Sequence, residues 1–113
     1  MNKEIIEYED FQKLEILTGT ILEVTDNVKA RKPAYILKIN FGEGVGIKYT
    51  SAQIKNYSAS ELLNRQVVAV CNFNKKNIAG IESEVLVLGS INENNDVILL
   101  RPDILVKNGS HIA

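Results

Sequence analysis

The stretch from Asn72 to Gly89, NFNKKNIAGIESEVLVLG, decides how this chain of 113 residues can fold. It joins the end of one apolar run, at Phe73, to a second apolar run that begins at Val85. Between the runs lies a loop of amide, lysine and glycine residues, Asn74 to Gly80. Two strands would hold this loop at the rim of a sheet, with donors facing outward as phosphates and base edges require. A solvated turn without a partner fits the same pattern.

Four apolar patterns lie before the Asn74 to Gly80 loop, and the last of them is the run that ends at Phe73. Ile16 to Val24 is rich in β-branched residues and is interrupted by Gly19, which predicts a strand with a bulge or sharp coil. Tyr35 to Phe41 alternates apolar and polar residues, and Val45 to Tyr49 continues with period two, so we expect a hairpin. Val67 to Phe73 is nearly all apolar and predicts a strand that is buried on both faces.

Short helices and turns are expected around these strands. Ser58 to Glu61 has the spacing of a capping box and predicts a short helix between the third and fourth strands. Ile5 to Leu14 places apolar residues at helical spacing, which predicts an amphipathic N-terminal helix. Ile104 to Val106, with the turn pair Asn108-Gly109, indicates a final short hairpin.

Five short strands with a small helix between the third and fourth are typical of an OB-fold barrel. We therefore predict an all-β chain with one domain over residues 1–113 and a barrel core over about 15–101. An OB-fold binds ligands on its second and third strands and on two loops, L12 between the first and second strands and L45 between the fourth and fifth. Lys29 to Pro33 falls in L12, and Asn74 to Gly80 falls in L45.

The charges are distributed unevenly, although the formal net charge is only −1. Residues 27–80 hold nine basic residues against Glu43 and Glu61, while both flanking segments are acidic. A nearly neutral protein can still present one positive face. Lysines scattered over the surface for solubility are the alternative. Because the basic residues of L12 and L45 fall on the binding loops of the fold, we favour a nucleic-acid surface.

Several motifs follow one another in a recognisable order along the chain. They are Asp10 to Ile21, Ser51 to Ile54, Asn72 to Gly80, Ser83 to Leu88, and Pro102 followed by Asn108-Gly109. In this order the sequence resembles the tRNA-binding domain family, which occurs as stand-alone proteins and appended to methionyl-tRNA synthetase. Within that family it is most similar to the CsaA-type secretion chaperones.

The resemblance implies an OB-fold with terminal elements, here 1–14 and 102–113, that mediate a homodimer. It implies that the partner is tRNA, recognised by backbone and shape, and for the CsaA branch also unfolded preproteins or export machinery. The RNA-binding residues that we predict are Arg31, Lys32, Lys48, Asn72, Lys75, Lys76 and Ser83. The residues that we predict at the dimer interface are Ile6, Phe11, Leu14, Ile104 and Val106.

Two positions depart from the family pattern. Leu17 stands where many members carry an arginine, and Glu84 follows Ser83 beside the predicted RNA surface, where its charge would repel phosphate. Asn72 and Ser83 also have a structural alternative, because each could satisfy local backbone groups instead of RNA.

Aromatic residues are candidates for base stacking, which OB-folds use on single strands. They are Tyr35, Tyr49, Tyr57 and Phe73, although Tyr35 shares a face with Leu37 and Ile39 and is better explained by core packing.

No pattern of catalytic or cofactor-binding residues stands out. The single cysteine, Cys71, alternates with apolar residues and is expected to be buried, and the single histidine, His111, lies far along the chain. We therefore expect no enzyme activity, no cofactor and no metal site. The acidic Met1 to Glu7 segment does not resemble a signal peptide and no apolar run reaches about 20 residues, so we expect a cytoplasmic protein without membrane insertion.

Overall fold

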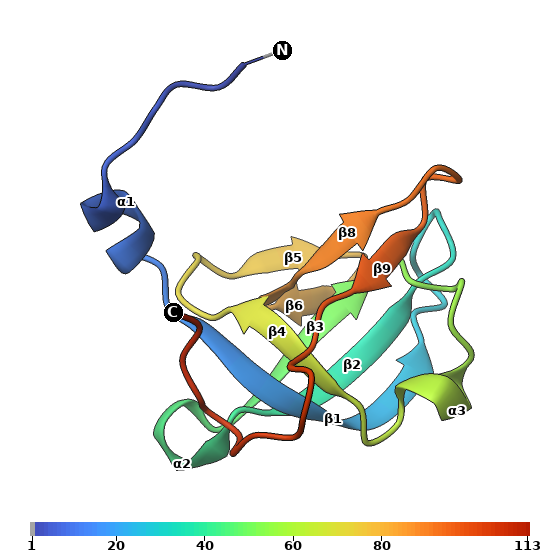
Figure 1. Cartoon of the computed structure of the whole chain (residues 1–113). Coiled ribbons are helices and arrows are strands. Elements are labelled where there is room, and N and C mark those ends of the chain that lie inside the picture. The colour runs from blue at the N-terminus through green and yellow to red at the C-terminus, as the bar shows by residue number, and fades with distance from the viewer. Residues whose placement is uncertain (1) are drawn as a thin grey trace.

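The computed structural model describes residues 2–113; Met1 lies outside the described residues. One antiparallel sheet of five strands curls into a nearly closed barrel, with the strand order β3-β2-β1-β4-β7 (Figure 1). Its strands are β1 (Ile16–Asp26), β2 (Tyr35–Asn40), β3 (Ile47–Ala52), β4 (Gln66–Val70) and β7 (Leu86–Val87). The predicted all-β OB-fold barrel is confirmed.

Short helices and two hairpins complete the chain. The helices are α1 (Tyr8–Gln12), α2 (Gly42–Val45) and α3 (Ala59–Leu62). The hairpins pair β5 (Lys76–Ile78) with β6 (Ile81–Ser83), and β8 (Gly89–Ile91) with β9 (Val97–Leu99). The capping box predicted for α3 is present, because Ser58 Oγ accepts from Glu61 N at 3.3 Å while Ser58 N donates to Glu61 Oε1 at 2.8 Å. No helix in residues 2–113 is long and apolar enough to cross a membrane.

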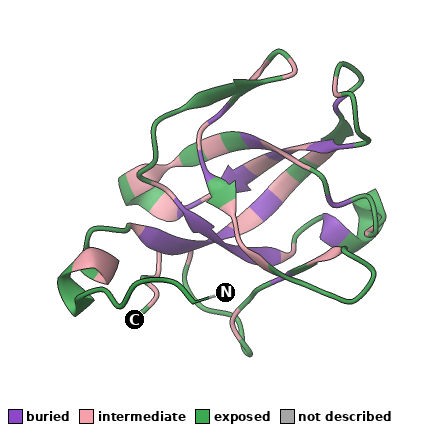
Figure 2. Ribbon diagram, turned by 90° about the horizontal axis from the view of Figure 1, so that it is seen from above, coloured by how far each residue is buried: buried purple, intermediate pink, exposed green. Residues whose placement is uncertain are grey.

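The barrel core is built on the alternation of β2. Leu37, Ile39 and Phe41 are fully buried, and the strand residues between them are half-buried on the outer face (Figure 2). Gly19 in β1 makes room for this row, since a Cβ there would lie 2.7 Å from Phe41 Cδ1. The β1–β2 register shifts between Ile21 and Glu23, so the irregularity predicted in the first strand lies just beyond the glycine.

Strand β4 is buried on both faces, as its apolar sequence predicts. Val67 and Ala69 face the barrel interior. Val68 and Val70 form a second cluster with Ile16, and this cluster is covered by Phe11, Leu88 and Ile112. Segments from both ends of the chain therefore pack on the outer surface of β1 and β4.

Residues 107–112 do not form the predicted C-terminal hairpin. They run beside the start of β1 instead, where β2 has not yet begun to pair. Gly109 N donates to Thr18 O at 2.8 Å, Thr18 N donates to Ser110 O at 2.9 Å, and Ile112 N donates to Ile16 O at 3.0 Å. The backbone groups of β1 are satisfied by a segment about 90 residues away in sequence, which no local pattern reveals.

The other differences concern where elements begin and end. The N-terminal helix covers only Tyr8–Gln12, because the capping box of Glu7 with Asp10 starts it there, and Ile5 and Ile6 before it are extended and exposed. The fourth strand ends at Val70 rather than Phe73.

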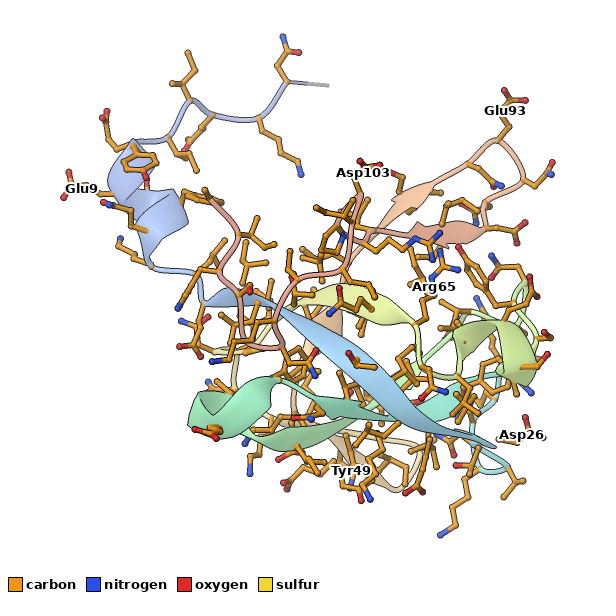
Figure 3. All side chains as sticks on the ribbon, turned by 60° about the horizontal axis from the view of Figure 1, so that its bottom comes forward. Glu9, Asp26, Tyr49, Arg65, Glu93 and Asp103 are labelled. Atoms are coloured by element: carbon orange, nitrogen blue, oxygen red, sulfur yellow. The ribbon has the colours of Figure 1, made fainter. Side chains whose placement is uncertain are left out.

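The apolar alternation in β3 lies on the outside of the barrel. Ile47 and Tyr49 are exposed, and the buried residue of this strand is Thr50; Figure 3 shows Tyr49 projecting from the sheet. The predicted fifth strand is also divided. Leu86–Val87 pairs with β4, and Gly89–Ile91 pairs with β9.

Replacing Gly19 by alanine should destabilise the fold, because the new methyl group would meet the Phe41 ring and the Ile39 Cγ2 atom at 2.7–2.8 Å. Overpacking of this kind costs about 1–3 kcal/mol. Urea unfolding measures the loss. Gly44→Ala is the matched control, since a Cβ there meets nothing within 4 Å. Equal stability of the two variants would contradict this account of Gly19.

Candidate nucleic-acid interface

Loop L12 connects β1 to β2 and is shaped by the buried Asn27. Its backbone N donates to Ala34 O at 2.9 Å, and its Oδ1 accepts from Lys29 N at 3.3 Å. Its Nδ2 donates to Ser51 Oγ at 3.1 Å, which ties the loop to β3. Between these anchors the side chains of Arg31 and Lys32 are exposed.

Loop L45 connects β4 to β7 and contains the hairpin β5–β6, where the sequence predicts an irregular loop. Ala79 and Gly80 form its two-residue turn with φ of 50° and 83°. Positive φ at both central positions is the turn geometry that matches strand twist. Gly80 N donates to Asn77 Oδ1 at 3.1 Å, which supports the turn. The hairpin is exposed on most of its surface.

The tips of the two loops lie together. A Cβ at Gly80 would be 3.2 Å from Lys29 Cδ, so the Lys29 side chain runs across the L45 turn. Four exposed cations of these loops form no salt bridge with any residue in 2–113. They are Lys29, Arg31, Lys32 and Lys76. This group is called the loop cations, and Lys29 is the member that links the two loops.

Lys48 and Lys75 are held by carboxylates. Lys75 Nζ lies 3.3 Å from Glu82 Oε1 and 3.5 Å from Glu84 Oε1, and Lys48 Nζ lies 3.8 Å from Glu84 Oε1. The hydrogen bond to Glu82 and the charge of that carboxylate raise the pKa of Lys75. Glu84 Oε2 also accepts from Tyr49 N at 2.9 Å. The charge of Glu84, which lies beside the predicted RNA surface, is thus matched by two lysines.

Ser83 joins β3 to the end of the hairpin. Its Oγ lies 2.6 Å from Thr50 Oγ1 and accepts from Ser51 N at 3.2 Å. Thr50 Oγ1 donates to Val85 O at 2.8 Å, so the Ser83 hydroxyl supplies the proton between the two side chains. Ser83 is buried, and its hydrogen bonds are made inside the protein.

Asn72 holds the N-terminal segment on the barrel. Its Oδ1 accepts from Glu15 N at 2.8 Å and its Nδ2 donates to Lys13 O at 2.7 Å. Contact of Asn72 or of Ser83 with RNA stays a prediction, and each residue has the structural role that was its alternative.

The aromatic candidates differ in exposure. Tyr35 is buried, and its hydroxyl donates to Tyr57 O at 2.9 Å. The Tyr57 hydroxyl accepts from Leu99 N at 3.1 Å, and the Tyr57 ring lies under the Arg65 guanidinium. Tyr49 and Phe73 are exposed and remain available for stacking.

Cys71 is half-buried at the end of β4. Burial is the main reason that the pKa of its thiol rises to about 11, so the thiolate is scarce at neutral pH. No group of three or more metal-ligating side chains is found among residues 2–113.

Sequence reasoning missed the roles of Asn27, Thr50 and Glu84 in positioning the loops, although it named Glu84 for its charge. An Asn directly after a strand is a signal for a turn that bonds its own backbone, and it could have indicated the first. The roles of Thr50 and Glu84 depend on partners more than 30 residues away. No local pattern could have shown them.

A small barrel with exposed cations on both L12 and L45, the two binding loops of this fold, is an OB-fold of the oligonucleotide-binding class. Comparison with protein families refines this class. Residues 16–111 match the family described as “Putative tRNA binding domain”. The chain belongs to this tRNA-binding domain family.

Relatives and solved structures agree with this assignment. The chain is 38% identical over 109 residues to methionine–tRNA ligase of Thermococcus onnurineus; the match covers 96% of the chain but only 14% of that enzyme. The CsaA chaperone of Picrophilus torridus has 50% identity and a TM-score of 0.92, covering 96% of this chain and 100% of that structure. The chaperone CsaA of Bacillus anthracis has 44% identity and a TM-score of 0.90, covering 97% and 100%.

Proposed function

We propose that the chain is a binding domain for tRNA, rather than an enzyme, and that it recognises the RNA by backbone and shape. The observation that carries the proposal is the set of loop cations, which are exposed on the two binding loops and form no salt bridge with any residue in 2–113. Cations in this arrangement suit phosphates, which dominate the affinity of nucleic-acid binding. Double-stranded RNA is read largely through its shape and backbone.

The proposal separates the predicted residues into two groups. Arg31, Lys32 and Lys76 can contact phosphate directly. Lys48 and Lys75 must first give up contacts with Glu82 or Glu84, so their contribution is smaller. The exposed Lys75–Glu82 pair is worth about 0.2–1 kcal/mol, which RNA can overcome.

Binding of tRNA should weaken steeply with salt. Four phosphate contacts give a slope of about −3 in log K against log salt concentration, and Lys76→Gln should reduce the magnitude of that slope by about one. Fluorescence anisotropy with labelled tRNA at several salt concentrations measures both quantities. Lys13→Gln is the matched control, because its ammonium is exposed on the N-terminal side and pairs with Asp10.

Glu82→Gln tests the ion pairs by removing a carboxylate instead of a lysine. It should raise affinity by about two- to fivefold at low salt, since it frees Lys75 from its nearer partner. Salt-independent binding, or no binding to folded tRNA, would refute the proposed function.

We also propose that the chain forms a homodimer through its terminal segments. Ile104 and Leu105 are 74% and 82% exposed, yet the neighbouring backbone is held firmly. Gln66 Nε2 donates to Val106 O at 2.7 Å, and Val106 N donates to Gln66 Oε1 at 3.1 Å. At the other end, Ile5 and Ile6 are exposed. Apolar side chains on an anchored backbone suit a partner surface.

Replacing Ile104 by aspartate should convert a dimer to a monomer, because it places a charge in the proposed apolar contact. Light scattering of the purified variant measures the mass. Ile47→Asp is the control, since Ile47 is an exposed apolar residue on β3. Phe11→Asp should have the same effect, but Phe11 also covers the Val68 cluster and its loss would affect folding. An unchanged mass for Ile104→Asp would contradict the proposed interface.

A second candidate function is binding of unfolded preproteins on their way to export. It is favoured by the 50% and 44% identity to structures named as CsaA chaperones. The exposed apolar residues at both ends of the chain could hold such substrates. A cytoplasmic location is part of both proposals.

The chaperone proposal predicts that the protein slows aggregation of an unfolded test protein, measured by turbidity. Loss of this effect on adding tRNA would indicate one shared surface, and persistence would indicate two surfaces. Lack of any effect on aggregation would exclude the chaperone function and leave tRNA binding untouched.

A further inference from the structure

A groove of ≈560 Å³ opens beside L45, between β3, the β5–β6 hairpin and the strands β7 and β9. Val85, Val87, Val97 and Leu99 contribute apolar side chains to its lining. Sites for small molecules have volumes of about 300–1,000 Å³ and combine an apolar lining with a few polar groups. The groove therefore has the size and character of a binding site.

Three polar lining residues and one aromatic lining residue have free binding capacity. The side-chain amides of Gln53 and Asn74 form no hydrogen bond with any residue that the structure describes, and Lys76 is one of the loop cations. The Phe73 ring is 50% exposed. An aromatic face, amides that both donate and accept, and a cation are the groups that bind a base, its edge and its phosphate.

We propose that this groove holds one unpaired nucleobase of the bound RNA. The base stacks on Phe73, its edge is read by Gln53 and Asn74, and the attached phosphate is neutralised by Lys76. This inference rests on the proposed function, to which it adds a contact with a base. Backbone recognition by the loop cations positions the RNA, and the groove then selects RNAs that can present an unstacked nucleotide.

The backbone groups along the β3 edge are already hydrogen-bonded, which favours a base over an extended peptide as the ligand of the groove. A peptide strand added to this edge would need its free N–H and C=O groups. Tyr49 N already donates to Glu84 Oε2, Tyr49 O accepts from Glu84 N, and Ser51 N donates to Ser83 Oγ. A base needs none of these backbone groups. The carboxylate of Glu84 also lines the groove, and its charge is matched by Lys48 and Lys75.

The test is a methyl NMR titration of the full chain with millimolar adenosine monophosphate, and with ribose 5-phosphate as the probe that lacks a base. The methyl signals of Val85, Val87 and Leu99 should shift with the nucleotide and stay in place with the sugar phosphate. Phe73→Leu should weaken nucleotide binding by about fivefold or more, because stacking on the ring is lost. Tyr8→Leu, which removes an exposed ring outside the groove, is the matched control.

Equal shifts with both probes would reduce the groove to an anion site and overturn the inference. The same holds if an unstructured apolar peptide shifts these methyl signals while the nucleotide does not. If the protein binds tRNA but the nucleotide shifts none of these methyl signals, the base-binding role of the groove is overturned and the proposed function stands. If the nucleotide shifts these signals but the protein fails to bind tRNA, the proposed function is overturned, while the groove is still a nucleotide-binding site.

Discussion

The hydrogen bonds of one buried hydroxyl, that of Ser83, hold the open side of the barrel together. The outermost strands of the sheet are β3 and β7, which do not pair with each other, and β7 pairs with β4 over only two residue pairs. Ser83 bonds Thr50 and Ser51 on the β3 edge, while Thr50 bonds Val85. Because Ser51 also accepts from Asn27, the same chain of polar contacts reaches L12. The spacing of both loops and the width of the groove depend on this connection.

Much of the fold could be predicted because its signals are local. The alternation of β2 identifies the core face, the capping box of Ser58 locates α3, and the order of elements then places L12 and L45 at the barrel rim. The basic residues of those loops were expected at the candidate interface for the same reason. Their proximity, seen in the Lys29 side chain lying over Gly80, follows from the topology.

The rest depends on contacts between residues distant in sequence. The L45 hairpin escaped prediction because its turn uses Ala79 at positive φ, where glycine or asparagine is usual. The Asn72 side chain bonds a backbone group 57 residues away. The sequence around Asn72 therefore does not show whether its amide faces RNA or the protein. For Glu84, sequence reasoning anticipated repulsion of phosphate, whereas the structure places two lysines around its carboxylate.

The pairing of residues 109–112 with the start of β1 has a consequence during synthesis. Before residues 109–112 have left the ribosome, β1 can pair with β2 and β4, but the amide of Thr18 and the carbonyl of Ile16 lack their partners. Those partners, Ser110 and Ile112, are translated after every strand of the barrel. The nascent barrel therefore exposes an unfinished strand edge until these residues emerge, and only then can the barrel be completed.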